Sequence, residues 1–234
     1  GLESDTDWTG PVSVADLAPQ CCEAHGVEPS PDRPCMLLRG VLSRAECARL
    51  LEALDGHHAP GAEGCVPGAR SQFVTDSPEL SALLWARIQH AVPRALDGGA
   101  VVGLQSRIAV AKCFPGQVGF AHMDFRHADP DDGAVASRIS FTLYLNDDYE
   151  GGHLDFVRSA NLDGTHGGAF LSIRPEPGWA AVFYQGVPEF MHYPCEVRRA
   201  PQAHPTGGSH APLSIPRASA SRDASRPETA LITG

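Results

Sequence analysis

The most regular pattern in the chain is a strict alternation of apolar and polar residues between positions 137 and 146. The apolar members are Ile139, Phe141, Leu143 and Leu145, and the polar members between them are Ser140, Thr142, Tyr144 and Asn146. Successive side chains of a strand point to opposite faces, so this segment predicts a strand with one apolar and one polar face. We expect the apolar face to pack on helices and the polar face to line a wet cavity.

Two helices and several further strands are predicted around this segment. Ser43 and Glu46 form a capping box that opens one helix, with Gly56 after its end. Ser77 and Pro78 open a second helix, which Pro93 ends. Apolar runs between turn residues predict strands at PCMLLRGV, 104–114, 118–125, 152–157, 169–173, 179–185 and 190–197. This order predicts a mainly β fold with flanking helices, a double-stranded β-helix or jelly roll.

Glycine and proline support a turn-rich fold and also suggest its limits. Together they make up about 19% of the chain, against about 12% in average proteins. Residues 35–200 hold ten prolines, whereas 1–34 and 201–234 hold five each. The last segment has no aromatic residue and too few large aliphatics to bury a core. We therefore predict an N-terminal arm (1–34), a folded domain (35–200) and a disordered Pro/Ser-rich tail (201–234).

Charge and cysteine content exclude several classes of function. The net charge is −10 and no basic stripe is present, which argues against nucleic-acid binding. The seven cysteines are odd in number and form no CxxC, so neither a disulfide framework nor a zinc finger fits. This usage favours a reducing, cytoplasmic location. No apolar run is long enough for a membrane helix, so no membrane association is expected.

A candidate metal site lies at His122-Met123-Asp124. Residues i and i+2 of a strand point to the same side, so His122 and Asp124 can reach one ion. His192, in the last predicted strand, supplies a third ligand. Two histidines and one carboxylate form a facial triad, which suits Fe(II) and leaves coordination positions open. The alternative to a metal site is that these are three unrelated polar residues at the ends of strands. A second HxD, at His153 and Asp155, lies too close to His192 to be preferred.

The ordered segments resemble the prolyl 4-hydroxylase-like branch of the 2-oxoglutarate/Fe(II) oxygenases. The matching stretches are FPGQVGFAHMD, SFTLYLNDDYEGGHLDF, RPEPGWAAVF and the distal His192, within residues 35–198. The resemblance implies a jelly roll in which His122, Asp124 and His192 bind Fe(II). It implies 2-oxoglutarate and O₂ as cosubstrates and suggests ascorbate as a further cofactor. Tyr144 matches the residue whose hydroxyl bonds a carboxylate of 2-oxoglutarate.

The C-terminal part departs from the family pattern in two ways. The family usually has a Lys or Arg nine to eleven residues beyond the distal histidine, to pair with the far carboxylate of 2-oxoglutarate. Here the nearest basic residues are Arg198 and Arg199, and strand parity favours Arg198. The alternative is that Arg198 is a solvated surface charge. The closing strand of the family is also missing, and the proline-rich tail takes its place.

These features predict a dioxygenase that hydroxylates an unactivated C–H of a peptidyl, prolyl included, or small-molecule substrate, releasing succinate and CO₂. Arg138 is open to two interpretations, a substrate contact or an ion pair. The alternative function is a catalytically impaired jelly-roll binding module that has lost 2-oxoglutarate binding. A cupin-like protein with another metal is disfavoured, because cupins use more histidines at closer spacing. The sequence leaves the substrate and the oligomeric state open.

Overall fold

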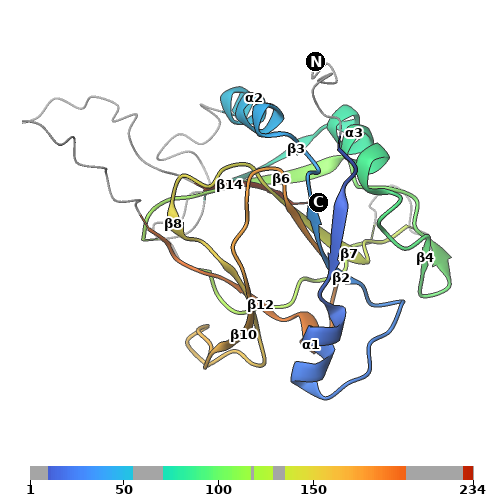
Figure 1. The fold of residues 1–234 in the computed structure, drawn as a ribbon, viewed down its shortest axis with the longest axis vertical. Coiled ribbons are helices and arrows are strands. Elements are labelled where there is room, and N and C mark those ends of the chain that lie inside the picture. Colours follow the sequence, from blue (N-terminus) through green and yellow to red (C-terminus); the bar gives the residue numbers. More distant parts are fainter. Residues whose placement is uncertain (1–9, 55–70, 117–118, 129–134, 199–228, 234) are drawn as a thin grey trace, which may run out of the picture.

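The chain folds as a jelly roll of two facing β-sheets (Figure 1). The computed structural model describes residues 10–54, 71–116, 119–128, 135–198 and 229–233. Within these ranges the larger sheet has the order β1 (Ser13–Asp16), β2 (Cys35–Arg39), β11 (Ala180–Tyr184), β7 (Ile139–Tyr144), β14 (Thr229–Thr233), β6 (Arg107–Cys113) and β3 (Ser71–Asp76). The smaller sheet has the order β10 (Ala169–Ile173), β9 (Leu154–Val157) and β12 (His192–Pro194). Neighbouring strands are antiparallel in both sheets, as expected for a jelly roll.

Two short strand pairs complete the described part of the chain. β8 (Glu150–Gly151) pairs with β13 (Val197–Arg198), beyond the end of β12. β4 (Ala95–Leu96) and β5 (Gly99–Ala100) form a hairpin through Asp97-Gly98, both with positive φ. That is the backbone of a type I′ turn, for which Asp-Gly is a favoured pair.

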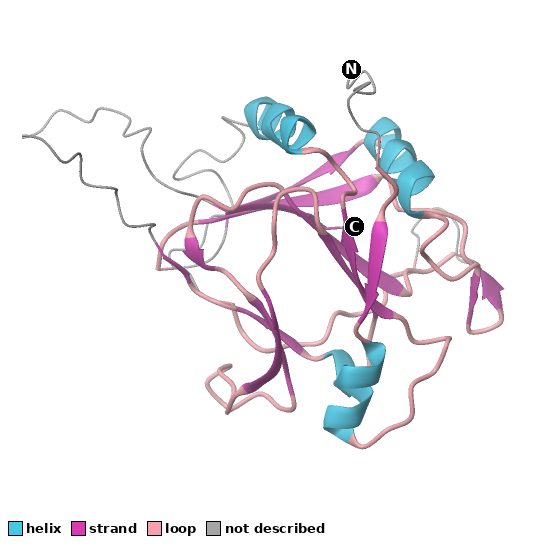
Figure 2. Ribbon diagram, viewed as in Figure 1, coloured by secondary structure: helices cyan, strands magenta, loops and turns pink. Residues whose placement is uncertain are grey.

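α2 (Arg44–Leu54) and α3 (Pro78–Ile88) lie along the larger sheet, and α1 (Ala18–His25) lies apart from them at the other end of the molecule (Figure 2). α2 and α3 contribute Leu50, Leu84 and Ile88 to a core shared with β2, β6, β7 and β11. The predicted capping box is present, because Glu46 N donates to Ser43 Oγ and Ser43 N to Glu46 Oε2. α1 and the 3₁₀ turn η1 (Pro188–Phe190) belong to a second buried cluster, which also contains Phe156 of β9 and Phe183 of β11. Gly56, the expected end of α2, lies outside the described residues.

The alternating segment forms β7, and both of its faces are as predicted in kind. Phe141, Leu143 and Leu145 are buried in the core that packs on α2 and α3. On the opposite face, Ser140 and Tyr144 point between the two sheets and are also buried. The polar face of β7 therefore lines the space between the sheets, where chemistry-bearing side chains gather.

The segment 118–125 is predicted as a strand, but its described residues, 119–125, form no regular strand. Gly116 N donates to Val197 O, Gly119 N to Pro194 O, and His122 forms an isolated bridge with His192. The register shifts by one residue between Gly119 and His122, which breaks the ladder. The predicted strand 190–197 is likewise divided into β12 and β13.

Both terminal segments differ from their predictions. Residues 13–25, assigned to an arm, form β1 on the edge of the larger sheet and α1, with Ala18, Cys21 and Cys22 buried. Proline does not prevent this, because Pro19 lies in the first turn of α1, where its missing N–H costs nothing. Residues 229–233, placed in the disordered tail, form β14 between β6 and β7. They add a strand to the larger sheet from the part of the chain that follows the distal histidine. Residues 201–228 lie outside the described residues.

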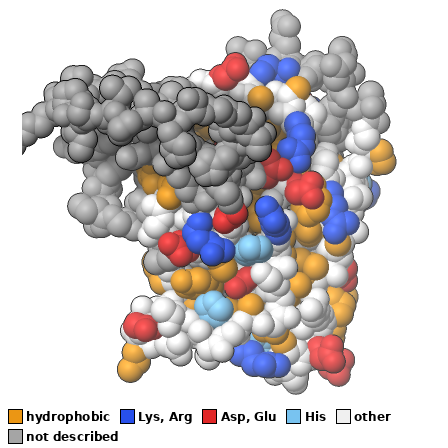
Figure 3. Space-filling model, turned by 60° about the vertical axis from the view of Figure 1, so that its left-hand side comes forward, with side chains coloured by type: hydrophobic (Ala, Val, Ile, Leu, Met, Phe, Trp, Pro, Cys, Tyr) orange, Lys and Arg blue, Asp and Glu red, His pale blue; other side chains and the backbone are white. Residues whose placement is uncertain are grey.

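The described surface and cysteines add little that is specific to function. Acidic and basic side chains are interspersed over the face drawn in Figure 3. In the described residues, no helix combines the length and apolar character needed to span a membrane. Among the described cysteines, Cys21, Cys22, Cys35 and Cys47 are buried as small core residues.

Candidate metal centre

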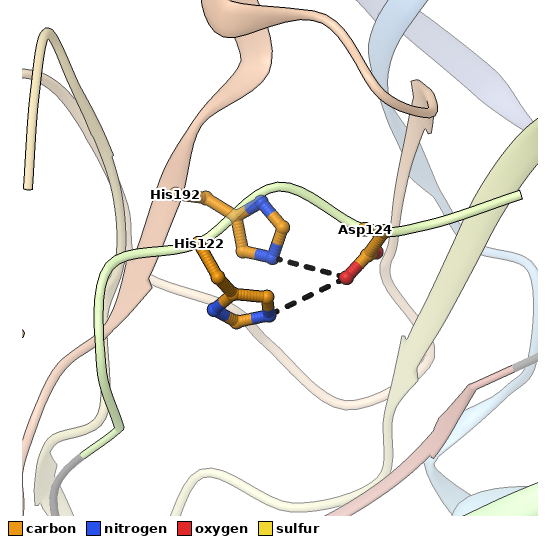
Figure 4. A group of neighbouring side chains, drawn as sticks. All are labelled: His122, Asp124 and His192. Carbon is orange, nitrogen blue, oxygen red and sulfur yellow. Dashed lines mark ion pairs between the residues drawn. The ribbon is translucent and has the colours of Figure 1, made fainter.

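His122 and His192 are brought together by their own backbones. Each donates its N–H to the carbonyl oxygen of the other, at 2.9 Å in both directions. Their side chains project to the same side of this bridge, with ring centroids 4.3 Å apart (Figure 4). His192 begins β12, and His122 lies on the extended segment beside it.

The two imidazoles are oriented in the same way. His122 Nδ1 lies 2.8 Å from the Phe120 carbonyl oxygen, and His192 Nδ1 lies 3.1 Å from the Phe190 carbonyl oxygen. A carbonyl oxygen only accepts, so both Nδ1 atoms must carry the proton. The other nitrogen of each ring, Nε2, faces Asp124 and is the atom available to a metal ion. A carbonyl partner of this kind is the usual support of a metal-binding histidine.

Asp124 closes the group. Its Oδ1 lies 3.3 Å from His122 Nε2 and 3.7 Å from His192 Nε2 (Figure 4). The three residues offer ligand atoms that all lie within 4.8 Å of one another, and in the described residues they are the one such group of three. His192 is buried, whereas His122 and Asp124 keep 23% and 30% of their side-chain surface exposed. The centre is therefore reachable from one side.

The surroundings of Asp124 keep it ionised. Burial opposes the charge, but the hydrogen bond with His122, the charge of His192 and the Ser140 hydroxyl outweigh burial and lower the pKa of Asp124 to about 2. The donor set is therefore two imidazoles, each with its Nε2 atom toward the centre, and one ionised carboxylate. Two imidazoles with one hard oxygen suit Fe(II) and leave room for further ligands.

Aromatic side chains pack near His192, the buried ligand of the centre. The ring of Phe183, in β11, lies 4.7 Å from that of His192, and the ring of Phe156, in β9, lies 6.4 Å away. Tyr144 belongs to the same buried cluster and ends β7. Burial, with Tyr149 and Cys113 nearby, raises the pKa of Tyr144, so its hydroxyl remains a donor. Tyr144 therefore stands on the side of the sheet that carries the triad.

Arg198, predicted as a ligand of 2-oxoglutarate, lies on the short β8–β13 pair. It pairs with Glu150 in the β8–β13 ladder, and its side chain is exposed. Its Nε lies beside Gly151, 3.5 Å from the position that a Cβ of this glycine would take. His153 is separate from the triad. Its backbone carbonyl oxygen accepts a hydrogen bond from Cys195 N. Asp155 of the second HxD instead accepts from Ser172 Oγ and lies 3.9 Å from His166 Nε2. Within the part of the chain that the structure describes, the second HxD is not part of a group of three possible metal ligands.

Several polar residues around the centre were not predicted as functional. Ser140 Oγ donates to Asp124 Oδ2, and Gln185 Nε2 donates to Ser140 Oγ. The signal for Ser140 was its place on the polar face of the alternating strand, but nothing in the sequence pairs Gln185 with it. Arg138, open to two interpretations, forms an ion pair, with its Nε 3.0 Å from Asp97 Oδ2.

Comparison with known proteins agrees with this architecture. Residues 108–206 match the family model of the 2OG-Fe(II) oxygenase superfamily, and this range contains all three triad residues. No curated protein matches the chain.

Solved structures similar to the chain include a viral collagen prolyl hydroxylase from Paramecium Bursaria Chlorella virus-1, in complex with 2OG. It is 17% identical, with 84% of this chain and 91% of that chain covered and a TM-score of 0.48. A Pseudomonas putida prolyl-4-hydroxylase is 19% identical, with 84% and 88% covered and a TM-score of 0.43. HygX from Streptomyces hygroscopicus, with nickel and 2-oxoglutarate bound, is 9% identical, with 85% and 80% covered and a TM-score of 0.47.

The jelly roll, the His-Asp-His group and the family match confirm the oxygenase assignment made from the sequence. Over residues 108–206, which hold the complete triad, the chain is similar to the 2OG-Fe(II) oxygenase superfamily, the similarity expected of a 2-oxoglutarate-dependent dioxygenase that uses Fe(II).

Proposed function

We propose that His122, Asp124 and His192 hold the Fe(II) of a 2-oxoglutarate-dependent hydroxylase. The observation that carries this proposal is the convergence of His122 Nε2, His192 Nε2 and Asp124 Oδ1, with both Nδ1 atoms held by carbonyls. When bound, iron would supply the oxidising chemistry that couples decarboxylation of 2-oxoglutarate to hydroxylation of a C–H bond. The protein residues orient the ligands, exclude water on the Phe183 side and leave the other side open.

The proposal assigns 2-oxoglutarate binding to Tyr144 and Arg198. The Tyr144 hydroxyl is kept protonated by burial, so it can donate to a carboxylate. It shares the inward face of β7 with Ser140, which contacts Asp124. Arg198 offers a guanidinium for the far carboxylate of the cosubstrate, near the β8–β13 pair.

We assign the substrate to a peptidyl group, prolyl included, or to a small molecule with an unactivated C–H. Two exposed aromatic residues flank the HxD, since Phe120 is 65% and Phe125 is 74% exposed. Large exposed apolar side chains beside a reactive centre favour a substrate that brings apolar surface of its own.

The test is succinate release by the purified protein with Fe(II), 2-oxoglutarate and O₂, with and without a proline-containing peptide. We expect succinate that depends on each component and is lost in His192→Ala. The alternative binding module would bind metal or ligand without releasing succinate. One ground for that module, the missing closing strand, is weakened by β14, which adds a strand to the larger sheet.

A further inference from the structure

The two oxygens of Asp124 have different partners. Oδ1 faces the Nε2 atoms of His122 and His192, whereas Oδ2 accepts a hydrogen bond from Ser140 Oγ. Ser140 is buried in β7, so this bond is shielded from water. Asp124 therefore has one carboxylate oxygen, Oδ1, available to a metal ion, while Oδ2 is already hydrogen-bonded to Ser140.

Gln185 holds Ser140 in place. Its Nε2 donates to Ser140 Oγ at 3.1 Å, and its Oε1 accepts from Ser137 Oγ at 2.9 Å. Ser137 Oγ in turn accepts from the backbone N–H of His127 at 2.8 Å. Gln185 is itself buried, directly after β11, and its N–H donates to Arg138 O. One amide therefore supports both the Asp124 carboxylate and the loop that follows Asp124.

The proton positions in this network have one consistent arrangement. With the Gln185 amide turned over, Ser140 would face two acceptors, Asp124 and Oε1, with only one proton to give. Ser137 would then face two N–H donors and have no acceptor for its own proton. In the observed orientation every hydroxyl donates once and accepts once, and the last proton points at Asp124 Oδ2.

We propose that Ser140, supported by Gln185, is a positioning residue that makes Asp124 a one-oxygen ligand of the metal. The torsion of an aspartate carboxylate is broad, so an unsupported Asp124 would turn and offer both oxygens. A second carboxylate oxygen on the metal would occupy a position that 2-oxoglutarate or O₂ needs. This inference rests on the proposed function, because it requires the metal to bind at the triad.

The experiment compares Ser140→Ala with Ser140→Thr, which keeps a hydroxyl, and with Ser172→Ala as the matched control. Ser172 also donates to an aspartate, Asp155, but in the second HxD, which is not part of the triad. Each variant is titrated with Co(II) without O₂, and the visible absorption of bound Co(II) reports its coordination. Thermal unfolding of each variant without metal checks folding.

We expect Ser140→Ala to lose about 10- to 100-fold in Co(II) affinity, the usual effect of removing a supporting contact of a metal ligand. Its absorption spectrum should also change, while Ser140→Thr and Ser172→Ala stay close to the wild type. Gln185→Leu should change affinity and spectrum in the same direction as Ser140→Ala, to a smaller extent, and it carries the test if Ser140→Ala does not fold.

Wild-type affinity and spectrum in a folded Ser140→Ala variant, or an equal loss in Ser140→Thr, would overturn the role of Ser140. A wild-type protein that binds no metal would instead overturn the proposed function, and this inference with it. If the wild type binds metal and releases succinate while Ser140→Ala is unaffected, the role of Ser140 is overturned and the proposed function stands.

Discussion

His122 and His192 are 70 residues apart in the sequence and donate their backbone N–H groups to each other's carbonyl oxygens. This reciprocal pair fixes the distance between the two imidazoles before any metal binds. The close approach is continued at Gly119, whose N–H donates to Pro194 O at 3.1 Å. The backbone pairing of the two segments, more than the histidine side chains themselves, sets the geometry of the centre.

Gly119→Ala should therefore weaken metal binding without removing a ligand. A Cβ at this position would stand 2.9 Å from Cδ and Cγ of Pro194, whose ring cannot turn away. The segment must shift, and His122 shifts with it, so we expect about a tenfold loss of Co(II) affinity, as for other losses of ligand support.

Gly103→Ala is the control for this substitution, because nothing lies within 4 Å of a Cβ at that glycine. Isothermal titration with Co(II) measures both variants. Equal affinities for Gly119→Ala and Gly103→Ala would contradict the view that the backbone pairing sets the geometry of the centre.

Tyr144→Phe should raise the KM for 2-oxoglutarate and leave metal affinity unchanged. A hydrogen bond to a charged group contributes about 1.5–3 kcal/mol, which corresponds to about a 10- to 150-fold change in binding. Tyr193→Phe is the control, since the Tyr193 ring packs on His166, which is not part of the triad. Succinate release against 2-oxoglutarate concentration is the measurement, and an unchanged KM in Tyr144→Phe would remove Tyr144 from the cosubstrate site.

Arg198→Ala distinguishes a cosubstrate ligand from a solvated charge. If Arg198 pairs with the far carboxylate, the KM for 2-oxoglutarate rises about tenfold or more and oxalate, which lacks the distal carboxylate, binds as in the wild type. The control is Arg158→Ala, whose exposed guanidinium bonds the Ala24 carbonyl near α1. Identical KM values in the two variants would leave Arg198 as a surface charge.

The sequence predicted the elements that depend on local patterns. The alternation at 137–146 corresponds to β7, the capping box at Ser43 is present, and the predicted strand 169–173 matches β10. The boundaries failed where pairing across the fold decides the outcome. The shift of register beside His122 and the placement of residues 229–233 between β6 and β7 depend on partners far away in the chain. No local composition encodes them.

The residues of the site also divide into those that the sequence could predict and those that it could not. Residue type and spacing identified His122, Asp124 and His192, which the structure brings together. Gln185 could not be predicted, because its function depends on a contact with Ser140, 45 residues away. A glutamine after an apolar strand has no distinctive local signature.

A buried ion pair joins the two helices behind the larger sheet and gives the fold a specific dependence on pH. Arg87 donates to both oxygens of Glu46, at 2.9 and 2.7 Å, and also to Val41 O. Burial raises the pKa of Glu46, but the bonds from Arg87 and Ser43 outweigh burial, so the pKa of Glu46 is lowered overall. A lowered folded-state pKa stabilises the fold above the unfolded-state pKa, about 4.3. That contribution is lost as the pH falls through the folded-state pKa.

Glu46→Gln should reduce the free energy of unfolding at pH 7 by about 3 kcal/mol, because it leaves the Arg87 charge buried and unbalanced. It should also flatten the fall in stability on the acid side of about pH 4.3. Asp147→Asn is the control, since it breaks the exposed pair with Arg44, worth less than about 1 kcal/mol. Urea unfolding at pH 7 and at several values between pH 5 and pH 3 measures both effects. A Glu46→Gln variant as stable as Asp147→Asn at pH 7 would show that the buried pair does not stabilise the fold.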